Sequence, residues 1–355
     1  MKYIDLLIFL RSIKKNPVEN LIKLFGLSLA FIALILIYLF IVYELSFDRF
    51  HPGADNIYRL EMAFDARGNH VHSALTAPLA GKTVLDEIAG IEAMTRIFTY
   101  SWKEEALIQY KDKEFYESKM LLVEPSFLKL FPFQILRGDE KTIFKEPNAI
   151  VISQRTAKKY FGDEDPIGKI INLKNFGDIE LVVTGVIENT PPNSHFSYDL
   201  LLPLESGKDI YWEPFLGTWR NRSFYTYIMI NKKSDIHLVE NEINKLITQK
   251  QPDARVKADY SLKPLSKIHL SSHLSDELQP NGSMTHLLFA FAIALVISII
   301  TISNYSSISM AQIFFRVREV GVKKLFGINA SRLGFQLIIE SVFFTISATL
   351  IALLC

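Results

Sequence analysis

The stretch AQIFFRVREVGVKKLFGINASRLGFQLIIES, Ala311 to Ser341, decides how the rest of the chain can fold. Upstream of it, residues 287–302 are almost wholly apolar. Downstream, residues 335–355 are apolar apart from a few side chains, chiefly Gln336 and Glu340. A run of about 20 apolar residues is long enough to cross a bilayer as a helix. The stretch therefore predicts a short connector between two transmembrane helices, at residues 285–315 and 335–355.

The connector, residues 316–334, is strongly basic. Against one acidic residue, Glu319, it carries five cations, which are Arg316, Arg318, Lys323, Lys324 and Arg332. Short loops rich in Lys and Arg remain in the cytoplasm. If this segment is helical, one face of the helix carries Val317, Val320, Gly321, Lys324, Leu325 and Ile328. Gly327 is a residue type that commonly ends helices. Two interpretations stay open: a basic helix on lipid headgroups, or a lever that contacts a soluble cytoplasmic partner.

The N-terminal region predicts an uncleaved signal-anchor. Residues 1–23 read as a cytoplasmic amphipathic helix with several Lys and Arg, broken at Pro17, and residues 24–43 read as the first transmembrane helix. The apolar run is too long for a signal peptide, and no small-residue cleavage site follows it. With the N-terminus in the cytoplasm, the three predicted transmembrane helices alternate so that both basic segments lie on the same side.

Residues 44–284 predict a large extracytoplasmic domain. Apolar alternation predicts strands at 58–64, 91–99, 225–229 and 258–264, and cap signals predict helices after Ala77, Ser153 and Ser234-Asp235. Since strand–helix–strand patterns occur at both ends, we expect residues 54–123 and 223–275 to form one membrane-proximal α+β subdomain. Residues 124–222 would be an inserted outer subdomain. The predicted fold class is a membrane protein with α-helical transmembrane spans and an α+β extracytoplasmic domain of two subdomains.

The sequence shows no convincing pattern for a catalytic, metal-binding or nucleic-acid-binding site. The segment Gly162 to Ile170 has the wrong spacing for a phosphate loop and leads into a predicted strand, and the chain has no Walker A motif. The pairs His70-x-His72 and His269-x3-His273 lack further ligands. The formal net charge is +1, which does not indicate nucleic-acid binding, and Cys355 is the single cysteine. We therefore expect no catalysis and no bound cofactor or metal.

Three motifs carry a resemblance to a known family. They are REVGVKKLFG at Arg318–Gly327 with Glu340-Ser341 downstream, YELSFDRFHPGADNIYRL at Tyr43–Leu60, and AIVISQRTAKKYFG with VVTGVIENTPPNSHF in the insert. Together they resemble the MacB/FtsX-type ABC transporter permeases with a MacB-like periplasmic core domain. The family has four membrane helices per unit, so the resemblance implies that this chain stops after the third.

The resemblance implies roles for particular residues. Residues that would couple to an ATPase are Arg316, Arg318, Glu319, Gly321, Lys323, Lys324 and Gly327. Residues of a stalk between membrane and outer domain would be Glu44, Asp48, Phe50, His51, Tyr58 and Arg59. For the stalk, a belt of interfacial residues is the alternative.

Polar residues inside the predicted membrane helices form a third set: Asn304, Gln336 and Glu340. Such residues usually hydrogen-bond to a neighbouring helix, and a groove at a dimer interface is the alternative. For Glu340 we expect a basic partner such as Arg332.

The resemblance implies a multi-pass permease of the inner (plasma) membrane. ATP and Mg would bind to a separate ABC-type ATPase subunit, whose motion would reach the outer domain for export or extraction of a substrate. A second permease copy, membrane lipids and a periplasmic or outer-membrane protein are further expected partners. An FtsX-like regulator of cell-wall hydrolases or signalling is the alternative, and a membrane-anchored enzyme is a third possibility without an active-site pattern. The substrate is not readable from the sequence.

Overall fold

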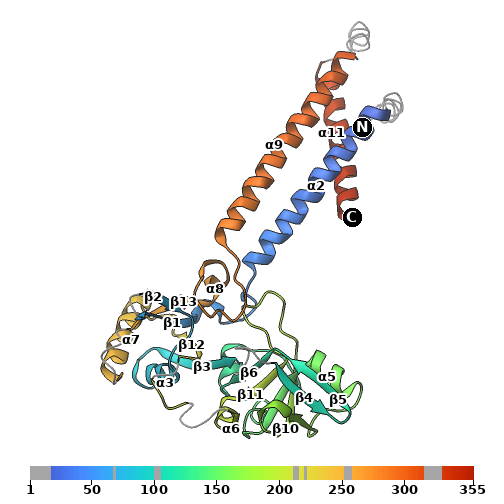
Figure 1. Ribbon diagram of the computed structural model, residues 1–355. Helices are drawn as coiled ribbons and strands as arrows, with labels where there is room; N and C mark the ends of the chain where they lie inside the picture. The colour runs from blue at the N-terminus through green and yellow to red at the C-terminus, as the bar shows by residue number, and fades with distance from the viewer. Residues whose placement is uncertain are drawn as a thin grey trace. The chain divides into compact units, whose positions relative to one another are not determined.

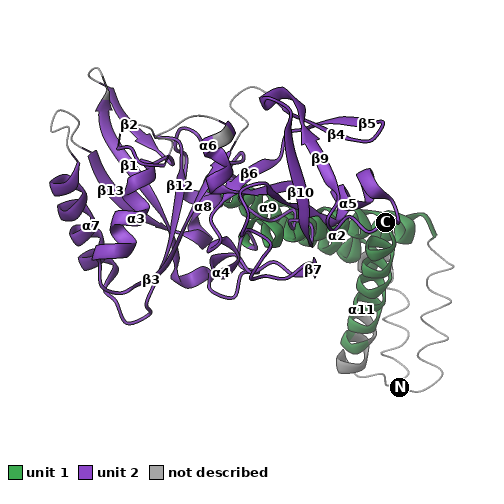
Figure 2. Cartoon of the chain, turned by 90° about the horizontal axis from the view of Figure 1, so that it is seen from below, with its two compact units in different colours: residues 1–45, 284–355 green, residues 46–283 purple. Residues whose placement is uncertain are grey.

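The computed structural model describes residues 17–66, 69–99, 105–210, 216–219, 222–251, 258–315 and 330–355. The chain divides into two compact units, one made of residues 1–45 and 284–355 and the other of residues 46–283 (Figure 2). The predicted N-terminal amphipathic helix, up to residue 16, and the basic connector at 316–329 lie outside the described residues.

The first unit consists of long apolar helices, α2 (Pro17–Leu45), α9 (Met284–Phe315) and α11 (Ala330–Leu354) (Figure 1). Within the described residues, α2 over Pro17–Leu45 and α9 over Met284–Gln312 are long and apolar enough to cross a membrane. The apolar part of α11, Ile338–Leu354, is shorter, so the third transmembrane helix stays a prediction. Leu27 of α2 packs with Phe344 and Ala348 of α11 in a small core.

The second unit is built on a mixed sheet (Figure 1). The described strands are β1 (Ile57–Ala66), β2 (Asn69–Ser73), β3 (Ile91–Thr99), β4 (Ala106–Tyr110), β5 (Lys113–Glu117), β6 (Met120–Val123), β7 (Ile135–Arg137), β8 (Ala149–Ser153), β9 (Ile170–Leu173), β10 (Ile179–Ile187), β11 (Leu200–Pro203), β12 (Tyr225–Ile230) and β13 (Ala258–Pro264). They follow the order β13-β1-β12-β3-β6-β11-β8-β10-β9-β4-β5, with β2 on β1 and β7 on β10.

One end of this sheet joins strands from both ends of the unit's sequence. β1 pairs antiparallel with β12 and β13, and β12 pairs antiparallel with β3. The helices α3 (Pro78–Glu87) and α7 (Ile236–Lys250) pack here, with Val84 and Ile243 fully buried against the strands. Apolar side chains at helical spacing therefore face apolar alternation on the strands, as the sequence pattern predicts.

At the other end, the pairs β8–β10 and β6–β11 are parallel, and α5 (Gln154–Phe161) packs against β8 and β10. The structure places β4 and β5 here, paired to each other and to β9. Residues 106–117 therefore do not lie with the 54–123 subdomain, contrary to the predicted boundary at residue 124. The reason is burial, since Ile108 and Leu173 fill the same hydrophobic core.

Local signals fix several element ends. Ser153 caps α5 by accepting a hydrogen bond from the Thr156 N–H, and Asp235 caps α7 by accepting from the His237 N–H. Gly162 ends α5 with a φ of 63°. The predicted starts of these two helices are confirmed.

A third core lies where the unit's two chain ends enter the fold. It contains the aromatic side chains Phe127, Phe131, Phe133, Phe196 and Tyr227. These come from α4 (Phe127–Leu130), the segment after it, the loop after β10, and β12. The short helices α6 (Gly207–Ile210) and α8 (Leu265–Ser271) complete the unit.

Candidate functional site

The candidate site begins with the segment that directly follows α2. Asp48 there has a φ of 58°, a left-handed backbone conformation that Asp tolerates better than most residues, and it is fully buried. Its N–H donates to the Asn193 carbonyl at 2.9 Å, and the Asn193 amide donates to the Ser46 hydroxyl at 3.0 Å. The loop at residues 190–196 therefore holds this segment in place.

The buried carboxylate of Asp48 organises the loop side of this contact. Its Oδ1 accepts from the His195 backbone N–H at 3.1 Å and from the Ser194 hydroxyl at 3.3 Å. The same oxygen lies 2.9 Å from Nδ1 of His195, whose Nε2 is 2.6 Å from the Tyr227 hydroxyl. The hydrogen bond between Asp48 and His195 therefore comes from the backbone N–H, and the His195 ring contacts Tyr227, so these residues connect the segment after α2 to strand β12.

His51 lies beside these residues in an aromatic pocket. Its ring is edge-on to Phe131 at 5.1 Å and to Phe133 at 5.3 Å, and Phe50 is 4.1 Å away. Among the described residues, neither ring nitrogen has a hydrogen-bond partner. Burial lowers the pKa of His51 to about 4, because the attraction of Asp48 does not offset the loss of solvent.

Arg59 on β1 anchors a second polar cluster. The guanidinium is fully buried and bonds to Glu61 at 2.7 Å, to Glu277 at 2.5 Å and to the Ser272 hydroxyl at 2.8 Å. Burial alone would raise the pKa of Glu277, but the hydrogen bond and charge of Arg59 hold that pKa below its usual value. For Arg59, burial acts to lower the pKa, and the bond to Glu277 with the surrounding negative charge raises it overall.

His269 of α8 joins the two chain connections of the unit. Phe47, which follows α2, stacks on the His269 ring with centroids 3.3 Å apart and planes 1° apart. Gly282, which precedes α9, donates its N–H to Nδ1 of the same ring at 3.5 Å. Both peptide connections to the helical unit are therefore fastened to one buried side chain.

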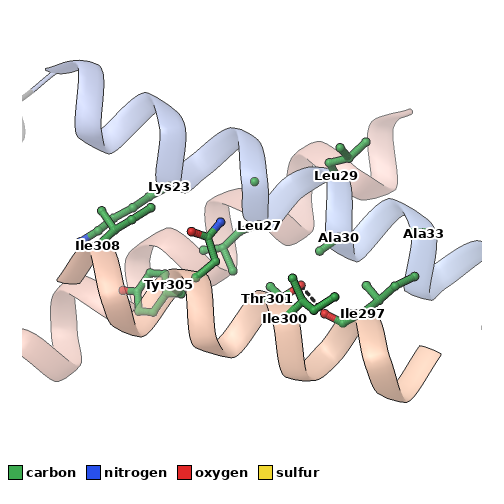
Figure 3. Close-up of a pocket in the computed structure, with 12 residues that line it drawn as sticks. Lys23, Leu27, Leu29, Ala30, Ala33, Ile297, Ile300, Thr301, Tyr305 and Ile308 are labelled. Atoms are coloured by element: carbon green, nitrogen blue, oxygen red, sulfur yellow. Dashed lines mark hydrogen bonds between the residues drawn. The ribbon is translucent and has the colours of Figure 1, made fainter. Parts of the chain in front are cut away.

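The helical unit holds a groove between α2 and α9 of about 400 Å³ (Figure 3). Small and apolar side chains from both helices line it, with Thr301, Asn304 and Tyr305 as the polar part. Lys23 closes one end, donating to Gln312 at 2.6 Å with its ammonium 5.3 Å from the Tyr305 ring. The predicted intramembrane residue Asn304 thus lines a groove.

The structure describes all of the predicted stalk residues, part of the intramembrane set and none of the coupling residues. Of the stalk residues, Asp48, His51 and Arg59 are buried in the clusters above, Phe50 is partly exposed, Tyr58 is half-buried on β1, and Glu44 lies at the end of α2. Glu340 is buried in α11. The coupling residues from Arg316 to Gly327, and the side chains of Arg332 and Gln336, lie outside the described part of the chain.

The sequence did not indicate a functional role for four of these residues: His195, Tyr227, Glu277 and Lys23, which is buried and bonds to Gln312. The PPNSH loop containing His195 was visible as a motif, but nothing local indicated its contact with Asp48, 147 residues away. Within the described ranges, no group of three or more His, Cys, Asp or Glu could hold a metal ion.

Comparison with known proteins gives a family match for most of this architecture. The MacB-like periplasmic core domain matches residues 21–246. A solved domain assigned to a permease protein of Porphyromonas gingivalis shares the fold, with a TM-score of 0.54 and 22% identity over 67% of this chain and 98% of that one.

Two further solved structures are more distant. The periplasmic region of MacB from Actinobacillus actinomycetemcomitans has a TM-score of 0.44 and 14% identity, covering 61% of this chain and 91% of that one. The extracellular domain of the noncanonic ABC-type transporter YknZ from Gram-positive bacteria has a TM-score of 0.43 and 15% identity, covering 58% of this chain and 99% of that one. No curated protein matches the chain.

Proposed function

We propose, from the premise that this chain belongs to the family of the MacB-like periplasmic core domain, that it is the transmembrane permease subunit of an ABC transporter. The chain is a membrane-anchored protein with an extracytoplasmic MacB-like domain. In the proposal, α2, α9 and α11 cross the inner membrane, and the basic connector faces the cytoplasm. A separate ATPase binds there and drives motion of the outer domain for export or extraction.

The observation that supports this coupling is the junction at His269. A helix that moves in a membrane can act on a soluble domain only if the connecting peptide is held rather than slack. Here Phe47, next to α2, stacks on His269, and Gly282, next to α9, donates to the same ring. Asn193 adds a second attachment at Ser46. Motion of α2 would therefore enter the domain at His269 and Asn193, and motion of α9 would enter it at His269.

The groove between α2 and α9 supports the second part of the proposal, assembly with a second permease copy. The groove is lined by the small residues Gly26, Ala30 and Ala33, which allow another helix to approach closely. Asn304 and Thr301 on the facing helix provide groups for hydrogen bonds between helices.

A pull-down from native membranes tests the coupling to an ATPase. The full tagged chain would be compared with Glu319→Lys, which reverses a charge in the connector, and with Glu242→Lys on the exposed face of α7 as a matched control. We expect an ABC-type ATPase to accompany the wild type and the control, and to be lost at least 10-fold in Glu319→Lys, because a reversed charge repels its former partner. Membrane insertion should be equal in all three.

Two outcomes would contradict the proposal. If no ATPase accompanies the wild type, the connector is a lipid-surface helix rather than a docking element. If Glu319→Lys retains the ATPase as well as the control does, coupling does not pass through this residue. A cell-wall hydrolase recovered together with the ATPase would instead favour the regulatory alternative.

A further inference from the structure

We propose that His51, Asp48 and His195 form a proton-operated latch, which holds the segment 46–53 against the loop 190–196 at neutral pH and releases it on acidification. This goes beyond the proposed function, because the latch needs neither an ATPase nor a substrate. It acts at the segment through which α2 connects to the outer domain.

The first step is that the pocket of His51 accepts a neutral ring and not a charged one. The residue is 2% exposed, and its closest rings are Phe50, Phe131, Phe133 and Phe196. In the described part of the chain, neither of its nitrogens meets a hydrogen-bond partner. Burying a charge without a hydrogen-bonded partner is strongly unfavourable, so protonation must drive the ring toward solvent.

The second step is to weigh every charge that faces His51. Its own segment contributes Asp48, which attracts a proton to the ring, and the loop after β10 contributes His195, which repels one. The segment after α4 contributes only Phe131 and Phe133, which do not ionise. On β12, Tyr227 contacts His195, and beyond it the charges of Arg59 and Glu277 pair with each other. Burial outweighs the attraction of Asp48.

The third step is that His51 shares its segment with the bonds of the latch. Asp48 holds the loop through its backbone bond to Asn193 and its carboxylate bonds to Ser194 and His195. A His51 ring that turns outward must move the short turn that contains Asp48. Release of these bonds therefore accompanies protonation.

The direction and size of the effect follow from linkage. In the closed form the pKa of His51 is about 4, and in an open form it returns to its ordinary value of 6.5. The open form then binds more protons between these values, so lowering the pH favours opening. Between pH 7 and pH 5 the ratio of open to closed forms should rise about 20-fold.

Amide hydrogen exchange of the full chain in detergent micelles tests the latch. After correction for the intrinsic pH dependence of exchange, peptides covering 46–53 and 190–197 should exchange about 20-fold faster at pH 5 than at pH 7 in the wild type. In His51→Phe, which keeps an aromatic ring but cannot take a proton, both peptides should be insensitive to this change. Peptides from β8, in the buried centre of the sheet, should not respond in either protein. Equal acid release in His51→Phe, or none in the wild type, would overturn the proposal.

A measurement on the wild type alone covers the case that the variant does not fold. Exchange of the histidine C2 hydrogens, followed by mass spectrometry over pH 3 to 9, reports the titration of each histidine separately. We expect His51 to exchange slowly and to titrate well below pH 6, with the exposed His70 as the fast internal reference. Titration of His51 near its ordinary value of 6.5 would exclude the latch.

Discussion

Arg59 and His51 are both buried polar residues of the sheet unit, but the surroundings of Arg59 stabilise a charged side chain and those of His51 do not. Arg59 is charged and its partners Glu61, Glu277 and Ser272 meet it within hydrogen-bond distance. His51 has rings around it and no hydrogen-bond partner for its nitrogens among the described residues. The first arrangement gives a fixed anchor over the physiological pH range, and the second gives a contact that depends on proton concentration.

The largest expected effect comes from breaking the anchor. Arg59→Met leaves two partly buried carboxylates without their cation, which should lower the free energy of unfolding by about 3–5 kcal/mol. Arg59→Lys should lose less, because it keeps the charge but not the forked geometry. Thermal or denaturant unfolding of the full chain in micelles measures both. A loss below about 1 kcal/mol in Arg59→Met would show that the cluster does not stabilise the fold.

A smaller and pH-dependent effect should come from His51→Phe. The folded pKa of about 4 lies below the unfolded value of 6.5, so the folded state binds fewer protons and stability falls as the pH decreases through this range. Between pH 7 and pH 5 the wild type should lose about 2 kcal/mol relative to the variant. Below about pH 3 the difference should become constant, because His51 is then protonated in both states. If the free energy of unfolding depends on pH in the same way in the wild type and in His51→Phe, the comparison is contradicted.

The smallest effect should come from the stack of Phe47 on His269. A double-mutant cycle with Phe47→Leu and His269→Gln should give a coupling energy of about 1 kcal/mol, as for other aromatic pairs. Tyr116→Leu, on an exposed edge strand, combined with His269→Gln is the matched control and should give additive effects. If both cycles are additive, the stack does not join the two chain connections energetically.

The sequence predicted the elements that depend on local chemistry. The caps at Ser153 and Asp235 lie where a side-chain oxygen precedes a run of helical spacing, and β1 and β12 lie where apolar residues alternate. These signals act over a few residues, so one sequence is enough to read them.

Contacts between distant segments could not be read in this way. Apolar alternation in β4 does not specify β9 as its partner, which left the subdomain boundary misplaced for residues 106–117. The motif around Asp48 and His51 indicated a stalk, but the physical role of these residues depends on His195 and Tyr227 far along the chain. The role of the connector, including Glu319, stays a prediction.

The length of α9 has a mechanical consequence. Its 32 residues, at a rise of about 1.5 Å each, give a rod about 48 Å long, whereas the hydrocarbon of a bilayer is about 30 Å thick. In the proposed topology, such a rod has more length than it needs to cross, and the excess would be taken up by tilt or by projection from the bilayer. A change in tilt of about 10° would move one end about 8 Å sideways relative to the other. A modest inclination in the membrane would thus become a displacement larger than a side chain at the helix end.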